Sequence, residues 1–239
     1  MEPLVSVSGL SHTYGVKENR AVALRRVDLE VAPGERLAIM GRSGSGKTTL
    51  LNILAGLETP TGGRVVIAGR DLAAAGRRDR EAYRRNVAGY VWQQPEDGLL
   101  PGLTAVENVM VPVLAGRGSG PEQVAVALGL LDAMGLRERL HDRPALLSPL
   151  EMQRLAVAVA LANRPLLLLA DELTARLDWD VACELLGDLT SLLDRLGTAA
   201  ILVTHDPRVA RYVDTALMIR DGVAAAATPE PGLARGHSR

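Results

Sequence analysis

Short apolar runs separated by polar turns recur along the chain and predict an α/β protein. Val5, Val7 and Leu10 alternate with small polar residues, which is typical of a strand with one buried face. The uninterrupted apolar runs at 166–170 and 199–204 suit strands that are buried on both faces of a parallel sheet. Further strands are predicted at 27–31, 37–40, 64–68, 89–92, 216–219 and 223–225.

Helical periodicity lies between these strands. It predicts a helix over 47–57 and a longer amphipathic helix over 178–196. The stretch from about 95 to 163 is helical and rich in loops, so the order is that of an α/β chain with a helical insert. The Ala-, Pro- and Gly-rich end, 226–239, predicts a flexible tail.

Composition removes several classes of protein. The 27 Lys and Arg residues nearly balance the 28 Asp and Glu residues, which argues against a nucleic-acid partner. The Arg-rich stretch 77–85 has no aromatic stacking platform and is interpreted as a solvated helix face. A single cysteine, Cys183, favours a reducing compartment. No apolar run reaches the roughly 18–20 residues that span a bilayer, so we do not expect a membrane protein.

A phosphate-binding loop is the strongest chemical motif. It follows the predicted strand 37–40 and opens the helix that begins at Lys47, which is where such a loop must lie. Its backbone amides and the helix N-terminus would bind phosphate, Lys47 would reach the β- and γ-phosphates, and Thr48 would bind Mg²⁺. The pattern G-x-x-x-x-G-K-[ST] is matched by Gly41, Arg42, Ser43, Gly44, Ser45, Gly46, Lys47 and Thr48, with Thr49 next in the chain.

The lysine of this loop also stands out in the composition. Lys47 is one of only two lysines among the 27 basic residues. A compact ammonium fits between two phosphates, whereas a planar guanidinium does not fit that cradle. Small-molecule kinases, GTPases and motor ATPases all share the loop, so the loop alone does not identify the reaction.

A pair of acids follows the apolar run 166–170. An apolar strand that ends in aspartate is the Walker B pattern, and Asp171 would hold Mg²⁺ directly or through water. Glu172 is the next residue, where an in-line attacking water needs a base or an orienting acceptor. Together with an upstream P-loop, the pair indicates a nucleoside triphosphatase.

With these residues the sequence resembles the ATP-binding subunits of ABC transporters over 3–225. Tyr14 lies where that family places an aromatic ring that stacks on adenine. Gln93 resembles the Q-loop glutamine, which senses Mg²⁺ and water and contacts the permease, with Gln94 as the alternative. Asp178 ends a segment that resembles the D-loop, and His205 resembles the switch histidine that contacts the γ-phosphate.

The resemblance implies a fold and a branch. The fold is a P-loop NTPase (RecA-like) core with an N-terminal antiparallel β-subdomain and an inserted helical subdomain. One domain would span 1–225, with its core in 1–93 and 164–225 and its helical subdomain in 94–163. The sequence of residues 45–57 most resembles that of the branch that serves lipoprotein release, macrolide-type export and cell division.

The signature segment departs from the family pattern. Residues 147–154 read LSPLEMQR, where the family has two glycines after the serine. Ser148 as N-cap, Pro149 at the first helical position and Glu151 at the third predict a capping box. Pro149 has no N–H and Leu150 adds a side chain, so we expect Ser148 and its neighbours to bind the partner's γ-phosphate poorly. Near the D-loop, Leu173 replaces the usual proline, and Arg176 enters a small-residue loop.

The resemblance therefore implies a subunit that binds and hydrolyses ATP with Mg²⁺ and powers a transmembrane permease. Lys47, Gln93, Glu172 and His205 would act in the hydrolysis, and Thr48, Gln93 and Asp171 would hold the metal. A second nucleotide-binding subunit, identical or different, would complete the ATP sites, and the protein would sit on the cytoplasmic face of the cell membrane. The alternatives are a mechanotransmission ATPase that gates a membrane partner without transport and, less favoured, a P-loop small-molecule kinase.

Overall fold

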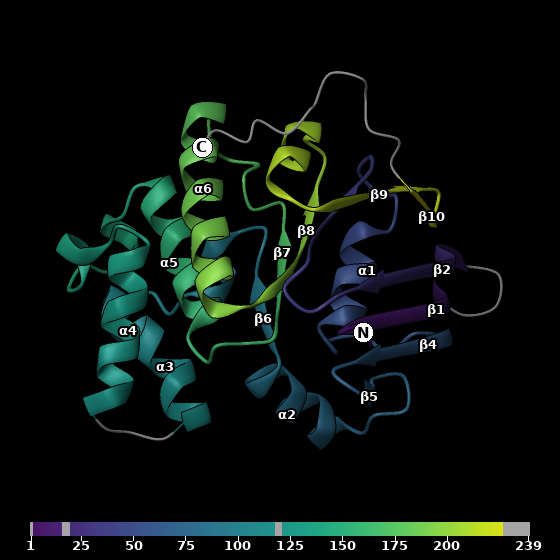
Figure 1. The fold of residues 1–239 in the computed structure, drawn as a ribbon, viewed down its shortest axis with the longest axis horizontal. Coiled ribbons are helices and arrows are strands. Elements are labelled where there is room, and N and C mark those ends of the chain that lie inside the picture. Colours follow the sequence, from purple (N-terminus) through teal and green to yellow (C-terminus); the bar gives the residue numbers. More distant parts are fainter. Residues whose placement is uncertain (1, 16–19, 118–120, 227–239) are drawn as a thin grey trace.

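The computed structural model describes residues 2–15, 20–117 and 121–226. Two β-sheets and a group of helices form the molecule (Figure 1). Of the predicted tail, Ala226 ends the last strand, and 227–239 lie outside the described residues. The strands are β1 (Val5–Tyr14), β2 (Ala21–Val31), β3 (Arg36–Met40), β4 (Gly62–Ile67), β5 (Arg70–Asp71), β6 (Ala88–Val91), β7 (Leu167–Asp171), β8 (Ala199–Thr204), β9 (Thr215–Arg220) and β10 (Val223–Ala226).

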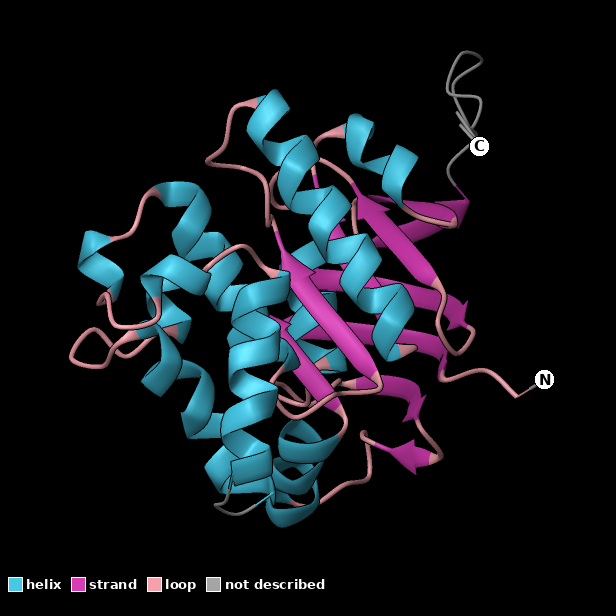
Figure 2. Cartoon of the chain, turned by 60° about the vertical axis from the view of Figure 1, so that its left-hand side comes forward, coloured by secondary structure: helices cyan, strands magenta, loops and turns pink. Residues whose placement is uncertain are grey.

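The helices cover the larger sheet and extend to one side of it (Figures 1 and 2). Helices α3, α4 and α5 follow β6 in the chain, and they pack on one another at the side of the molecule away from β1 and β2. The helices are α1 (Lys47–Leu54), α2 (Arg77–Asn86), α3 (Ala105–Arg117), α4 (Pro121–Ala133), α5 (Pro149–Leu161) and α6 (Trp179–Leu196).

The larger sheet has the order β10-β9-β3-β8-β7-β6. All its pairs are parallel except β9 with β10, which form a hairpin around Asp221-Gly222 from the strands predicted at 216–219 and 223–225. The smaller sheet, β2-β1-β4-β5, is antiparallel and lies at the side where the chain begins. The predicted fold, a parallel core with an N-terminal antiparallel layer and inserted helices, is confirmed.

Strand β7 lies between two hydrophobic clusters because its side chains alternate. Leu168 and Ala170 belong to the cluster that contains α3, α4, α5 and α6. Leu167 and Leu169 belong to the cluster that contains α1 and the smaller sheet. This buried strand therefore holds Asp171, its last residue, in a fixed position between the two.

Several element boundaries differ from the predictions. The helix predicted over 47–57 ends at Leu54, because Gly56 takes a left-handed conformation with φ of 66°. The strand predicted at 27–31 begins at Ala21, because Ala21 already pairs with Tyr14. The Arg-rich stretch is helix α2, in which Tyr83 is fully buried and donates a hydrogen bond to the carbonyl of Leu54 (2.7 Å).

Candidate functional site

The P-loop lies at the carboxyl edge of the larger sheet, between β3 and α1. Because β3 has β9 on one side and β8 on the other, the loop emerges where ligands bind in open α/β sheets. A Cβ at Gly41 would lie 2.3 Å from the carbonyl oxygen of Ile219, and one at Gly46 would lie 2.4 Å from that of Ala23. Both positions therefore require glycine, because β9 and β2 pack directly against the loop backbone.

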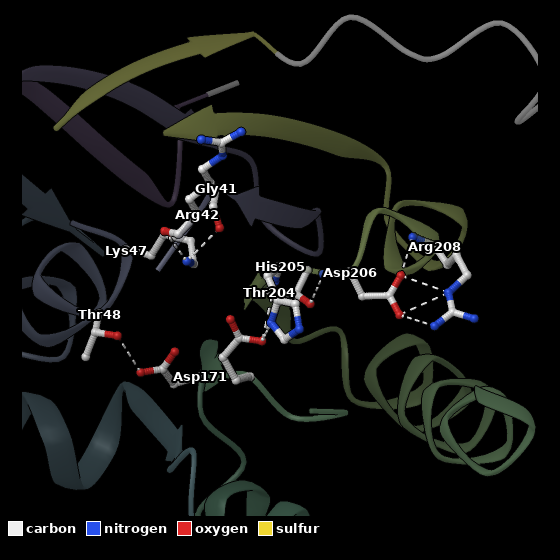
Figure 3. Close-up of polar contacts among 10 residues, drawn as sticks. Gly41, Arg42, Lys47, Thr48, Asp171, Thr204, His205, Asp206 and Arg208 are labelled. Carbon is white, nitrogen blue, oxygen red and sulfur yellow. Dashed lines mark hydrogen bonds and ion pairs between the residues drawn. The ribbon is translucent and has the colours of Figure 1, made fainter. Parts of the chain in front are cut away.

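Lys47 is folded back onto this loop. Its side chain is buried, and its Nζ donates to the carbonyl oxygens of Gly41 (2.8 Å) and Arg42 (3.1 Å), as Figure 3 shows. The ammonium thus lies at the loop mouth, where phosphate oxygens would compete with those carbonyls for its three donors. Of the other loop residues, Arg42, Ser43 and Gly44 are exposed, and Ser45 is buried.

Thr48 and Asp171 meet across the start of α1 and the end of β7. The Thr48 hydroxyl donates to Asp171 Oδ2 (3.0 Å), whereas Asp171 Oδ1 is buried with no hydrogen-bond partner among the described residues (Figure 3). Burial raises the pKa of Asp171, and the bond from Thr48 opposes that shift. A hydroxyl and an orphaned carboxylate oxygen are the hard donors that Mg²⁺ prefers, so these residues fit the ion.

Glu172 and His205 form a second pair at the same sheet edge. Glu172 Oε2 lies 2.8 Å from His205 Nδ1 and also accepts a long bond from the His205 backbone N–H (3.4 Å). The glutamate is largely buried, while the imidazole is mostly exposed. Glu172 has φ of 48°, an uncommon conformation for a residue other than glycine, and such backbone outliers concentrate at functional sites.

Gln93 reaches this edge through the register of the sheet. Val91 at the end of β6 pairs with Ala170 of β7. Gln93 follows Val91 by two residues, and Glu172 follows Ala170 by two residues. Gln93 and Gln94 are both exposed. Register thus brings the segment after β6 alongside the segment that carries the acidic pair, and it does not select between the two glutamines.

Tyr14, Ser148 and Asp178 make their contacts elsewhere. Tyr14 ends β1, and its hydroxyl lies 3.2 Å from the Thr49 hydroxyl on α1. Ser148 caps α5 in the predicted capping box, which is confirmed. Asp178 is the exposed N-cap residue of α6, and its side chain makes no capping bond.

The two unusual residues near the D-loop have structural partners. Leu173 is buried and belongs to the cluster of α3 to α6. Arg176 pairs with Glu96 (3.2 Å), which lies just beyond Gln93 in the chain. The arginine therefore joins the segment after β7 to the segment after β6.

Four polar residues that are linked to Tyr14 by hydrogen bonds or ring contacts could not be predicted from the sequence. They are His12, Asn52, Glu58 and Tyr90, and they come from β1, α1, the turn after α1, and β6. No motif links them, because their spacing along the chain reflects only how these elements pack.

Within the part of the chain that the structure describes, no helix has both the length and the apolar character needed to cross a membrane. Comparison with protein families matches residues 24–175 to the family described as ABC transporter. Among curated proteins, the lipoprotein-releasing system ATP-binding protein LolD of Pseudomonas fluorescens is 42% identical over 219 residues, covering 92% of this chain and 96% of that one.

A second relative is the macrolide export ATP-binding/permease protein MacB of Marinobacter nauticus. It is 42% identical over 220 residues, which are 92% of this chain and 34% of MacB. Among solved structures, the dimeric ATP-binding cassette MJ0796 in a post-hydrolysis state, bound to ADP and Pi, has a TM-score of 0.84. It is 35% identical and covers 95% of this chain and 100% of that chain. These relatives agree with the predicted branch, and the chain belongs to the ABC transporter family as an ABC-type ATPase.

Proposed function

We propose that this chain is the ATP-binding and hydrolysing subunit that drives a membrane-embedded permease through nucleotide-dependent dimerisation. One observation carries the proposal: the P-loop, the Thr48–Asp171 pair and the Glu172–His205 pair converge on one sheet edge. The relatives named for lipoprotein release and macrolide export suggest a permease of that branch. The subunit would then be peripheral on the inner face of the cell membrane.

The residues divide the work by position. The P-loop amides would hold the phosphates, and Lys47 would turn from the carbonyls of Gly41 and Arg42 toward the β- and γ-phosphates. Mg²⁺, when bound by Thr48, Asp171 and the side chain of Gln93, would neutralise phosphate charge. Glu172 would orient the attacking water and accept its proton.

His205 would contact the γ-phosphate and would also hold Glu172 in place. Its Nδ1 faces the carboxylate at 2.8 Å, so its Nε2 is left to contact the γ-phosphate. A short contact to His205 also restricts the Glu172 side chain, which holds its oxygens in place for a water molecule.

The permease would dock beside Gln93. A cleft of about 250 Å³ lies among β6, α2, α3 and α5, and Trp92 and Pro112 line it with Ala156 and Val159. Arg84 and Arg85 line it as well. Since Trp92 immediately precedes Gln93, a permease segment in this cleft would sit one residue from Gln93. We propose that residues 94–163 move with the permease as the helical subdomain.

The signature segment suggests that the two ATP sites of the dimer are unequal. Ser148 Oγ accepts from the Glu151 N–H (3.3 Å), and the Ser148 N–H donates to Glu151 Oε2 (2.8 Å). Pro149 has no N–H, and the N–H groups of Glu151 and Met152 both bond to Ser148, so among the described residues Leu150 has the one uncommitted amide in the first turn of α5. We propose that this P-loop works with the consensus signature of a different subunit, while its own signature completes a weak second site.

Purification of the protein from its native host tests both the ATPase function and the proposed inequality of the two ATP sites. We expect the chain to co-purify with a permease and with a second ATPase subunit in equal amounts, and Lys47→Ala in this chain to abolish most ATP hydrolysis by the complex. The contrary result is that a dimer of this chain alone hydrolyses ATP rapidly and that Lys47→Ala in one of its two protomers leaves that rate unchanged. That pair of results would contradict the proposal that the two ATP sites are unequal. Phosphoryl transfer to a small acceptor would point instead to a kinase.

A further inference from the structure

The exposed ring of Tyr14 is fixed by contacts at its far end. Although the residue is 41% exposed, its hydroxyl donates to Glu58 Oε2 (2.7 Å) and lies 3.2 Å from the Thr49 hydroxyl. The imidazole of His12 packs edge-on against the Tyr14 ring, with centroids 4.6 Å apart and planes at 80°. A lone surface tyrosine would sample several rotamers, whereas these contacts select one.

Glu58 is itself anchored on both carboxylate oxygens. Its Oε1 accepts from Asn52 Nδ2 (3.1 Å), and Asn52 Oδ1 in turn accepts from the Tyr90 hydroxyl (3.2 Å). Burial raises the pKa of Tyr90, so that hydroxyl stays protonated and remains a donor. The line of contacts therefore runs from β6 through α1 to the turn at Glu58, and from there to Tyr14.

His12 adds a second contact to the same carboxylate. Its Nε2 lies 3.5 Å from Glu58 Oε2, the oxygen that also accepts from Tyr14. His12 is 7% exposed, so the ring cannot move away from Glu58 without opening β1. Glu58 thus joins β1 to α1, although no motif includes it.

We propose that Glu58 is a positioning residue for the nucleotide base. The inference rests on the proposed function and on the stacking of Tyr14 on adenine that the family resemblance implies. Glu58 does not touch the nucleotide; it holds the phenol oxygen so that the face of the Tyr14 ring is set before the base arrives. A ring that is ordered in advance loses less conformational entropy on binding, which strengthens the affinity for nucleotides but not for ligands without a base.

The test compares MgATP with magnesium tripolyphosphate, which has the phosphates but no base. Dissociation constants of the full chain are measured by calorimetry for wild type, Glu58→Gln and Tyr14→Phe. We expect both variants to weaken MgATP by about two- to tenfold, as for the loss of one hydrogen bond. Tripolyphosphate affinity should be unchanged. Glu30→Gln, at an exposed position of β2, is the matched control and should change neither value.

Tyr14→Ala distinguishes the stacking of Tyr14 on the base from the positioning of Tyr14 by Glu58. We expect it to weaken MgATP more than Tyr14→Phe does, and Glu58→Gln to add nothing in that background. Equal weakening of both ligands, or an additive effect with Tyr14→Ala, would show a merely structural role for Glu58 and overturn the proposal. If Tyr14→Ala leaves MgATP affinity unchanged, the base-stacking role of Tyr14 fails and this inference fails with it. Tyr14→Phe keeps the test valid if Glu58→Gln lowers the melting temperature.

Discussion

Replacing Pro149 and Leu150 by glycine should raise the ATPase activity of this chain on its own. Pro149→Gly returns an N–H to the first position of α5, and Leu150→Gly removes a side chain from the surface that would face a partner's γ-phosphate. One regained charge-assisted hydrogen bond is worth about 1.5–3 kcal/mol, or about 10- to 150-fold in rate. The double variant should therefore hydrolyse ATP at least about tenfold faster in steady state.

The same change should make the protein less stable. Leu150 is half-buried against the cluster of α3 to α6, and glycine also weakens a helix. Together these losses come to about 2 kcal/mol, which lowers the melting temperature of a chain of this size by about 4–8 °C. Faster hydrolysis with lower stability is a combination that general improvement of folding could not produce.

The assay measures phosphate release by the purified chain at saturating MgATP, with nucleotide affinity measured alongside. Ser148→Ala is the control, since it removes the cap of the same helix without adding an amide and should give no gain. The single variants show whether the missing N–H or the added side chain is the main defect. A double variant that is folded, binds ATP as tightly as wild type and yet hydrolyses it no faster would refute the reasoning.

Three further predictions concern the acidic edge and the P-loop. Glu172→Gln should keep ATP binding and lower hydrolysis by more than about 100-fold in single-turnover assays; retained turnover would exclude its proposed role. Gly41→Ala should weaken MgATP binding more than about tenfold, because its Cβ would lie 2.3 Å from the Ile219 carbonyl, whereas Gly102→Ala, with open space, should not. Burial raises the pKa of Asp171. Just above pH ~3.9 the native state therefore binds more protons than the unfolded chain. As the pH rises through that range, the contribution of Asp171 to the free energy of unfolding falls. Asp171→Asn should therefore raise the melting temperature at pH 7 without Mg²⁺ or nucleotide, but not below pH ~3.5; a decrease at pH 7 would contradict this.

Local patterns were sufficient for much of the fold. The apolar run at 199–204 is strand β8 without any change of bounds, and the capping box at Ser148 forms as its residue types predict. The predicted strand bounds were wrong where a distant segment decides them. β2 begins at Ala21 because β1 supplies its partner, and β5 exists only because Arg70 and Asp71 pair with β4.

The site divides in the same way. Lys47, Thr48 and Asp171 could be found from sequence because a motif fixes their spacing relative to a strand or helix end. Glu58 could not, since its importance depends on Tyr14, 44 residues earlier in the chain. The pairing of Arg176 with Glu96, 80 residues apart, is equally invisible until β6 and β7 are placed side by side.

Under the proposed function, the position of β7 between two hydrophobic clusters would place metal binding and water activation against different halves of the molecule. Asp171 ends the strand on the side of α1, where it meets Thr48. Glu172 leaves the strand with a left-handed backbone and turns to His205 at the end of β8. A shift of the helices α3 to α5 would press on Leu168 and Ala170 from one side only. Under the proposed function, such a displacement would alter the timing of hydrolysis while Mg²⁺ stays bound.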